Sequence, residues 1–255
     1  MKSQNMSPFL FVSDLDNTLI GDDTALKSLN QYLVSHRQQF NSKIVYETGR
    51  SLYLYRLLAK VKSLLAPDVL ITSVGTEMYF SPDQDIFEPE WAAILSQGWN
   101  REEIVDIASN FEELQFQPKS EQNPYKISYY LAQAAIDEIL PKLKASLLAR
   151  GYEVKLIYSA GQDLDLLPQN STKGLAVQFL RRKWDIAASE TIVCGDSGND
   201  ISMFTESKKG IIVGNAKPEL LQWYQENKNE TLYLAQSCYA AGIIEGLKHF
   251  NYFDF

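Results

Sequence analysis

The sequence has few cysteines and no excess of positive charge, and each shortage excludes a class of protein. Only two cysteines, Cys194 and Cys238, occur in 255 residues, and their separation does not match the spacing of a zinc site. Cys194 lies in the apolar run TIVC, so we expect a buried free thiol there. The net charge of −8 argues against nucleic acid as a partner, because phosphate backbones bind clustered lysine and arginine.

Long apolar runs are missing as well. No stretch approaches the roughly 20 residues that cross a bilayer as a helix. The first residues, MKSQNMSPFLF, lack the charged region and the apolar core of a signal peptide. We therefore expect a cytoplasmic protein with no membrane partner. The hydrophobic content of 45% is sufficient for a sizeable core.

Continuous apolar stretches alternate with helical patterns at both ends of the chain. They predict buried strands, typical of a parallel α/β sheet covered on both faces, at 9–14, 43–48, 69–74, 191–196 and 210–213.

The middle of the chain differs, because the stretches 126–131 and 152–160 alternate between apolar and polar residues. Such alternation predicts a sheet with one covered face. We therefore predict an α/β fold with a parallel-sheet core, residues 1–80 and 163–255, into which an α+β domain, residues 81–162, is inserted.

Two aspartates follow the first predicted strand. The stretch FLFVSDLDNTLIGDD, residues 9–23, places Asp14 and Asp16 at its carboxyl end, the edge where open α/β sheets bind ligands. Side chains two residues apart on an extended strand point to the same side. Their mutual repulsion favours a compensating cation, and hard oxygen ligands suit Mg²⁺. The alternative is a strand end followed by a turn in which Asp16 caps the next segment.

A second acidic loop follows a later predicted strand. The stretch TIVCGDSGND, residues 191–200, ends in Asp196 and Asp200, and its two glycines allow a tight loop. The same residue types are common in ordinary turns, which is the alternative. Four carboxylates at one edge of a sheet would repel strongly without a cation.

Two further residues can hold a phosphate. Thr48, in the stretch TGR, lies at a predicted strand end, where a hydroxyl and backbone N–H groups can bind phosphate oxygens. Lys173, in NSTKG, supplies a matching point charge. The alternatives are a helix cap for Thr48 and a solvated surface position for Lys173. Both histidines, His36 and His249, fall on predicted helices, which gives no support to a phosphohistidine mechanism.

The four motifs DLDNT (14–18), TGR (48–50), TKG (172–174) and GDSGND (195–200) resemble, in order and position, those of the haloacid dehalogenase superfamily of phosphatases. The resemblance implies a Rossmann-like core with a cap domain, a Mg²⁺ cofactor and an aspartyl-phosphate intermediate. Asp14 would be the nucleophile and Asp16 the general acid and base. Phosphate would be bound by Thr48, Gly49, Lys173 and Asn199, and Mg²⁺ by Asp14, the backbone carbonyl of Asp16, Asp196 and Asp200.

Three stretches resemble the sucrose-phosphatase family of that superfamily more closely: ETGRS (47–51), EQNPYKISYYL (121–131) and SAGQDLDLLPQNSTKG (159–174). This implies hydrolysis of sucrose 6F-phosphate to sucrose and phosphate, the last step of sucrose synthesis. The chain ends at the last predicted core helix. In this it resembles the short bacterial form of the family, which has a C2-type α/β cap. The sugar hydroxyls would be bound by Glu47, Asn123, Lys126, Ser128, Asp163 and Asp165.

Several alternatives stay open at this point. Lys126 and Ser128 could simply occupy the wet face of the inserted sheet, and Asp163 and Asp165 a polar hinge. The substrate could be a glucosylglycerate or mannosylglycerate phosphate, or a hexose phosphate. A non-catalytic partner domain of sucrose-phosphate synthase is a different class of function, against which the intact acids argue. The resemblance suggests association with that synthase, and we expect a monomer.

Overall fold

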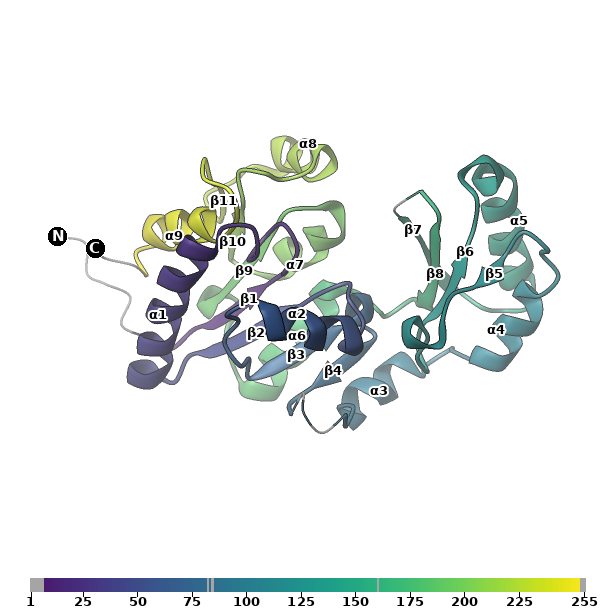
Figure 1. Ribbon diagram of the computed structural model, residues 1–255, viewed down its shortest axis with the longest axis horizontal. Coiled ribbons are helices and arrows are strands. Elements are labelled where there is room, and N and C mark those ends of the chain that lie inside the picture. Colours follow the sequence, from purple (N-terminus) through teal and green to yellow (C-terminus); the bar gives the residue numbers. More distant parts are fainter. Residues whose placement is uncertain (1–6, 82, 84, 160, 253–255) are drawn as a thin grey trace.

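The computed structural model describes residues 7–81, 83, 85–159 and 161–252, so predictions for the other residues fall outside the described part. It contains two sheets, each with its own helices (Figure 1). The larger has the strand order β11-β10-β9-β1-β2-β3-β4, parallel except for β4. Its strands are β1 (Leu10–Ser13), β2 (Lys43–Glu47), β3 (Val69–Thr72), β4 (Glu77–Tyr79), β9 (Thr191–Gly195), β10 (Lys209–Ile212) and β11 (Leu232–Leu234).

Helices cover both faces of this sheet, which explains why its strands are apolar on both sides. In β1, Phe11 packs in one cluster with α1 and α9, whereas Leu10 and Val12 pack in another with α6 and α7. The helices on the first face are α1 (Asp23–Phe40), α2 (Leu52–Val61) and α9 (Tyr239–His249). Those on the second are α3 (Pro89–Leu95), α6 (Lys173–Trp184), α7 (Ile201–Glu206) and α8 (Pro218–Asn227). The predicted parallel α/β core is confirmed.

The smaller sheet is antiparallel, with the order β5-β6-β8-β7. Its strands are β5 (Gln115–Phe116), β6 (Ile127–Tyr130), β7 (Val154–Ser159) and β8 (Asp163–Pro168). One face packs on α4 (Arg101–Ala108) and α5 (Ile136–Ala149), through residues such as Ile127 and Leu166. These two helices lie on the side away from the large sheet (Figure 1), so the other face turns toward it. The predicted sheet with one covered face is confirmed.

The predicted division of the chain at residue 163 is wrong for β8. Residues 163–168 pair with both β6 and β7, so they complete the small sheet instead of returning to the core. This pairing also removes the alternative of a polar hinge for Asp163 and Asp165. On the entry side, Trp91 and Leu95 of α3 are buried in a cluster of the large sheet, so this helix packs with the core.

Two smaller points follow from the described residues. Cys194 is buried and free, as predicted, whereas Cys238 is exposed and free. Within the described ranges, no helix combines the length and the apolar character needed to cross a bilayer.

Candidate active site

The sequence motifs meet at the carboxyl edge of the large sheet because β1 pairs in parallel with both β2 and β9. The register aligns Ser13 with Tyr46 on one side and with Cys194 on the other. Asp14 therefore leaves β1 between the ends of the other two strands, and its backbone N–H donates to the carbonyl of Cys194 at 3.1 Å. The pairing of three adjacent strands brings distant motifs to one place.

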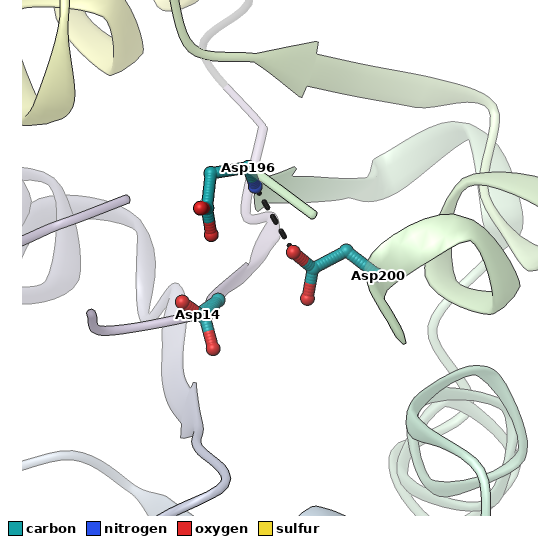
Figure 2. Close-up of side chains that lie close together, drawn as sticks. All are labelled: Asp14, Asp196 and Asp200. Carbon is teal, nitrogen blue, oxygen red and sulfur yellow. Dashed lines mark hydrogen bonds between the residues drawn. The ribbon is translucent and has the colours of Figure 1, made fainter. Parts of the chain in front are cut away.

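Three aspartates form the centre of this edge. Asp14, Asp196 and Asp200 are all buried, and one carboxylate oxygen of each lies within 4.8 Å of the others. Their carboxylates surround a common space (Figure 2). Burial raises the pKa of Asp14 to about 7, and it raises that of Asp196 to about 6 with a contribution from Asp200. Burial and mutual repulsion disfavour the charged carboxylates, and a divalent cation bound between them would favour the charged forms again. Carboxylate oxygens are also the hard ligands that such cations prefer.

Lys173 compensates part of this negative charge. Its ammonium donates to Asp14 Oδ1 at 2.7 Å and to Asp200 Oδ1 at 2.6 Å, and its side chain is fully buried. Burial alone would lower the pKa of this lysine, but the two aspartates raise it above its ordinary value. Lys173 is the first residue of α6, held there because Thr172 caps the helix by accepting from Leu175 N–H. The alternative of a solvated surface lysine is wrong.

The loop after β9 holds Asp200 in place. The Oδ2 atom of Asp200 accepts from the backbone N–H groups of Asp196 and Ser197, at 2.9 and 3.0 Å. A side chain at Gly195 would meet Asp200 at 2.5 Å, so the close approach requires glycine there. Thr18, which we did not single out from the sequence, donates to Asp196 Oδ1 at 3.1 Å.

Asn199 does not join the buried cluster. Its side chain is exposed, and its Oδ1 accepts from Ser197 Oγ at 2.9 Å. Thr48 and Gly49 follow β2, where Thr48 is fully buried and its hydroxyl accepts from Arg50 N–H at 3.2 Å. The alternative of a helix cap for Thr48 is wrong, because Ser51 caps α2 by accepting from Leu54 N–H at 3.4 Å.

Asp16 lies outside the three-aspartate cluster, contrary to the expectation that an extended strand aims it with Asp14. The strand ends at Ser13, and the chain then turns, with Asn17 in the left-handed region at φ 61°. Both oxygens of Asp16 accept from Arg50, each at 2.8 Å, and the Asp16 side chain is 43% exposed. Arg50 stood in the quoted TGR motif without an assigned role. The fit of guanidinium to carboxylate is the signal that could have identified it.

Glu47, at the end of β2, is a carboxyl group in the interior of the protein. It is fully buried, and neither of its oxygens has a hydrogen-bond partner within the part of the chain that the structure describes. Burial raises its pKa well above the ordinary value, while Lys173 and Lys155 oppose that rise. Lys155 belongs to β7, and its ammonium donates to the carbonyl of Ser171 at 3.1 Å. Glu47 thus faces charges from both domains.

The open face of the small sheet carries a polar cluster. Ser128 on β6 lies opposite Asp165 on β8 and donates to its Oδ1 at 2.6 Å, while Lys126 is 3.5 Å from the same oxygen. All three are buried, so they are not simply solvated residues of a wet face. Asp163, by contrast, accepts from Gln117 at 2.9 Å.

Polar and apolar contacts join the two domains, and among the apolar ones Tyr125 of the small domain packs against the cluster of the large sheet that contains Trp91. Asn123 of the small domain donates to Thr76 Oγ1 at 2.9 Å, and Ser51 donates to Glu121 at 3.4 Å. The structure therefore gathers the core residues at one sheet edge and Lys126, Ser128 and Asp165 on the facing sheet.

Comparisons with known proteins agree with this architecture. A profile of the family described as sucrose-6F-phosphate phosphohydrolase matches residues 7–251. The crystal structure of the sucrose-phosphatase from Synechocystis sp. PCC6803, in complex with sucrose and phosphate, is 43% identical, with a TM-score of 0.84 over 97% of this chain and 100% of that chain. Solved haloacid dehalogenase-like phosphatases and hydrolases with 15% and 20% identity share the fold, which confirms the predicted fold class.

Two curated relatives differ in how much of their own length this chain covers. Probable sucrose-phosphatase 2 of Arabidopsis thaliana is 38% identical over 95% of this chain, but the chain spans only 59% of the length of that relative. The mannosylfructose-phosphate phosphatase of Agrobacterium fabrum is 31% identical over 96% of this chain and 98% of its own length.

The buried lysine gives a first prediction, on stability. Lys173→Met leaves Asp14 and Asp200 without their cation, so in metal-free buffer it should lower the free energy of unfolding by about 3–5 kcal/mol. For a chain of this size that corresponds to a fall in Tm of roughly 10 °C, measured by thermal unfolding in EDTA.

Lys183 on the same helix provides the matched control. It pairs with Glu88 and Glu90 near the surface, so Lys183→Met should change the Tm by less than about 2 °C. Equal Tm values for Lys173→Met and the wild type would show that the cluster does not depend on this charge.

Proposed function

The chain belongs to the sucrose-6F-phosphate phosphohydrolase family, and on that premise we propose that it hydrolyses sucrose 6F-phosphate to sucrose and phosphate, with Mg²⁺ as cofactor. The observation that carries the proposal is the buried cluster of Asp14, Asp196, Asp200 and Lys173 at the carboxyl edge of the sheet. Phosphoryl transfer requires positioning and neutralisation of spread negative charge, and this cluster provides both.

Asp14 is the proposed nucleophile. Its carboxylate oxygen attacks phosphorus, the bond to the sugar oxygen breaks, and an aspartyl phosphate forms on the protein. Mg²⁺, held by Asp14, Asp196, Asp200 and the backbone carbonyl of Asp16, would neutralise charge on the phosphoryl oxygens. Lys173 already contacts Asp14 and serves the same oxygens, together with Thr48 and Gly49. Asn199 is exposed, and its contact with phosphate remains a prediction.

Asp16 is the proposed general acid and base. It gives a proton to the departing sugar oxygen, and it then takes one from the water that attacks the aspartyl phosphate. Its half-exposed position at the rim suits exchange with both partners. Both of its oxygens accept from Arg50, so this pair must separate before an oxygen of Asp16 is free to carry the proton.

The polar residues of the small sheet and Glu47 are the proposed sugar contacts. Sugar hydroxyls can donate to the two unpaired oxygens of Glu47, which removes the cost of burying them. Lys126, Ser128 and Asp165 offer donors and acceptors from the opposite side, and Asn123 and Asp163 flank them. A substrate without the matching hydroxyls would leave these groups unpaired, so this set provides specificity.

A related substrate, mannosylfructose phosphate, is the second candidate. The relative that acts on it by name matches nearly the full length of both chains. A glycerate-linked or hexose phosphate has weaker support, and a non-catalytic partner domain conflicts with the intact cluster. Association with sucrose-phosphate synthase, a monomeric state and a cytoplasmic location remain predictions.

The nucleophile provides the second prediction. Asp14→Asn should reduce kcat on sucrose 6F-phosphate at least about a thousandfold, because no carboxylate remains to form the covalent intermediate. Phosphate release is the measurement. Asp23→Asn is the control, since Asp23 is an exposed aspartate paired with Lys62, the residue that follows α2. Retained activity in Asp14→Asn would remove the proposed mechanism.

Metal removal provides the third prediction. Dialysis against EDTA should abolish phosphate release, and Mg²⁺ should restore it. Independently of activity, Mg²⁺ at about 100 times its Kd should stabilise the fold by about 2.7 kcal/mol, which thermal unfolding detects as a higher Tm. Asp196→Asn should reduce that shift. Full activity and an unchanged Tm in metal-free buffer would contradict a metal at this cluster.

Substrate discrimination provides the fourth prediction. The wild type should prefer sucrose 6F-phosphate over glucose 6-phosphate by at least about 100-fold in kcat/KM. Asp165→Asn should lower kcat/KM for the sucrose ester about 10- to 100-fold by weakening a charged hydrogen bond, without affecting 4-nitrophenyl phosphate. Comparable rates on glucose 6-phosphate would refute the substrate, and faster hydrolysis of mannosylfructose phosphate would favour the second candidate.

A further inference from the structure

The turn between β3 and β4 has an unusual backbone. Ser73, Val74 and Gly75 have consecutive positive φ angles of 52°, 59° and 85°. A β-branched residue such as Val74 is rarely found in the left-handed region, because its side chain crowds the backbone there. Such a conformation persists only where the surroundings impose it, and it tends to occur where function requires it.

On one side, the turn is bonded to the segment that follows β2. The N–H of Ser73 donates to the carbonyl of Arg50 at 2.8 Å, and that of Val74 donates to the carbonyl of Thr48 at 3.3 Å. Thr48 is proposed to hold the phosphate, and Arg50 is the residue that binds Asp16. A shift of the turn therefore shifts the backbone of both.

On the other side, the hydroxyl of Thr76 links the turn to the small domain. Thr76 Oγ1 accepts from Asn123 Nδ2 at 2.9 Å and donates to the carbonyl of Ser73 at 2.8 Å. The orientation of the Asn123 amide is fixed, since its oxygen accepts from Tyr125 N–H at 2.8 Å. Thr76 is buried, so water does not readily replace either bond.

The turn also contacts both chain segments that connect the domains. Trp91 on α3, the last core helix before the small domain, donates from Nε1 to the carbonyl of Gly75 at 3.0 Å. Ser171, in the segment that returns from β8, donates to the carbonyl of Val74 at 3.0 Å. The next two residues of that segment are the cap of α6 and Lys173. The turn and the adjacent Thr76 thus contact Asn123 of the small domain and the core segments before and after that domain.

We propose that Thr76 is a positioning residue that transmits the placement of the small domain, through the Ser73–Gly75 turn, to Thr48 and Arg50. Docking of the sugar on the small sheet thereby aligns the phosphate-binding hydroxyl and the Arg50–Asp16 pair. The inference rests on the proposed function, and it adds to that function a route by which sugar recognition affects the chemical step.

The test compares a sugar ester with a small ester. Thr76→Val keeps the shape of the side chain and removes its hydroxyl. It should lower kcat on sucrose 6F-phosphate about tenfold, because the hydroxyl that joins Asn123 to the Ser73 carbonyl is gone, with KM changed less than about threefold. Hydrolysis of 4-nitrophenyl phosphate, which has no sugar to dock, should stay within about twofold of the wild type. Thr76→Ser should restore the rate on the sugar ester.

Two controls separate positioning from simple support of the fold. Thr191 has a comparable buried hydroxyl, which donates to the Ala187 carbonyl at 3.0 Å. It lies at the start of β9, away from the active-site end of that strand, so Thr191→Val should leave both rates unchanged. In an Asn123→Ala background, Thr76→Val should change kcat by less than about twofold, because the link is already broken.

The outcomes are distinct. Equal losses on both esters, with a lower Tm, would mean that Thr76 only supports the fold, and wild-type rates on both would mean that it transmits nothing; either result overturns the inference alone. A wild-type protein inactive on both esters would overturn the proposed function, and the inference with it.

Discussion

The contacts of Lys173 with Asp14 and Asp200 are the interaction on which the rest of the site depends. Three aspartates are buried within reach of one another, and desolvation and mutual repulsion both oppose their charged forms. One lysine compensates only part of that charge, so the cluster retains a net negative charge that a divalent cation can neutralise. The parallel pairing of β1 with β2 and β9 is what keeps this arrangement rigid enough to persist.

The same edge separates two aspartates that are almost adjacent in sequence. Asp14 is buried against Lys173, whereas Asp16 reaches the rim and pairs with Arg50. A turn just after β1, with Asn17 in the left-handed region, produces this difference. Two carboxyl groups in unlike surroundings can take unlike roles, one attacking phosphorus and the other moving a proton.

A feature of the fold or of the site could be predicted from the sequence where neighbouring residues determine it. Strand ends marked by Asp14, Thr48 and Asp196 could be located from apolar runs and turn residues, and the edge they share follows from parallel pairing. The Asp16–Arg50 pair could not be located, because it depends on where β1 stops and how the chain turns. Residues 163–168 were assigned to the core because Asp163 and Asp165 read as part of a polar hinge, and only pairing with β6 and β7 reveals their sheet.

Glu47 is a buried group of the core that lies close to charges of both domains. A fully buried carboxyl group without a hydrogen-bond partner destabilises the core that holds it, yet it stands beside Thr48 and faces Lys155 from the small domain. A ligand that donates to both of its oxygens removes that penalty, and an analogue without those donors does not. For the proposed sugar contact, pairing of these oxygens would therefore contribute to the free energy of recognition and favour a ligand that reaches both domains.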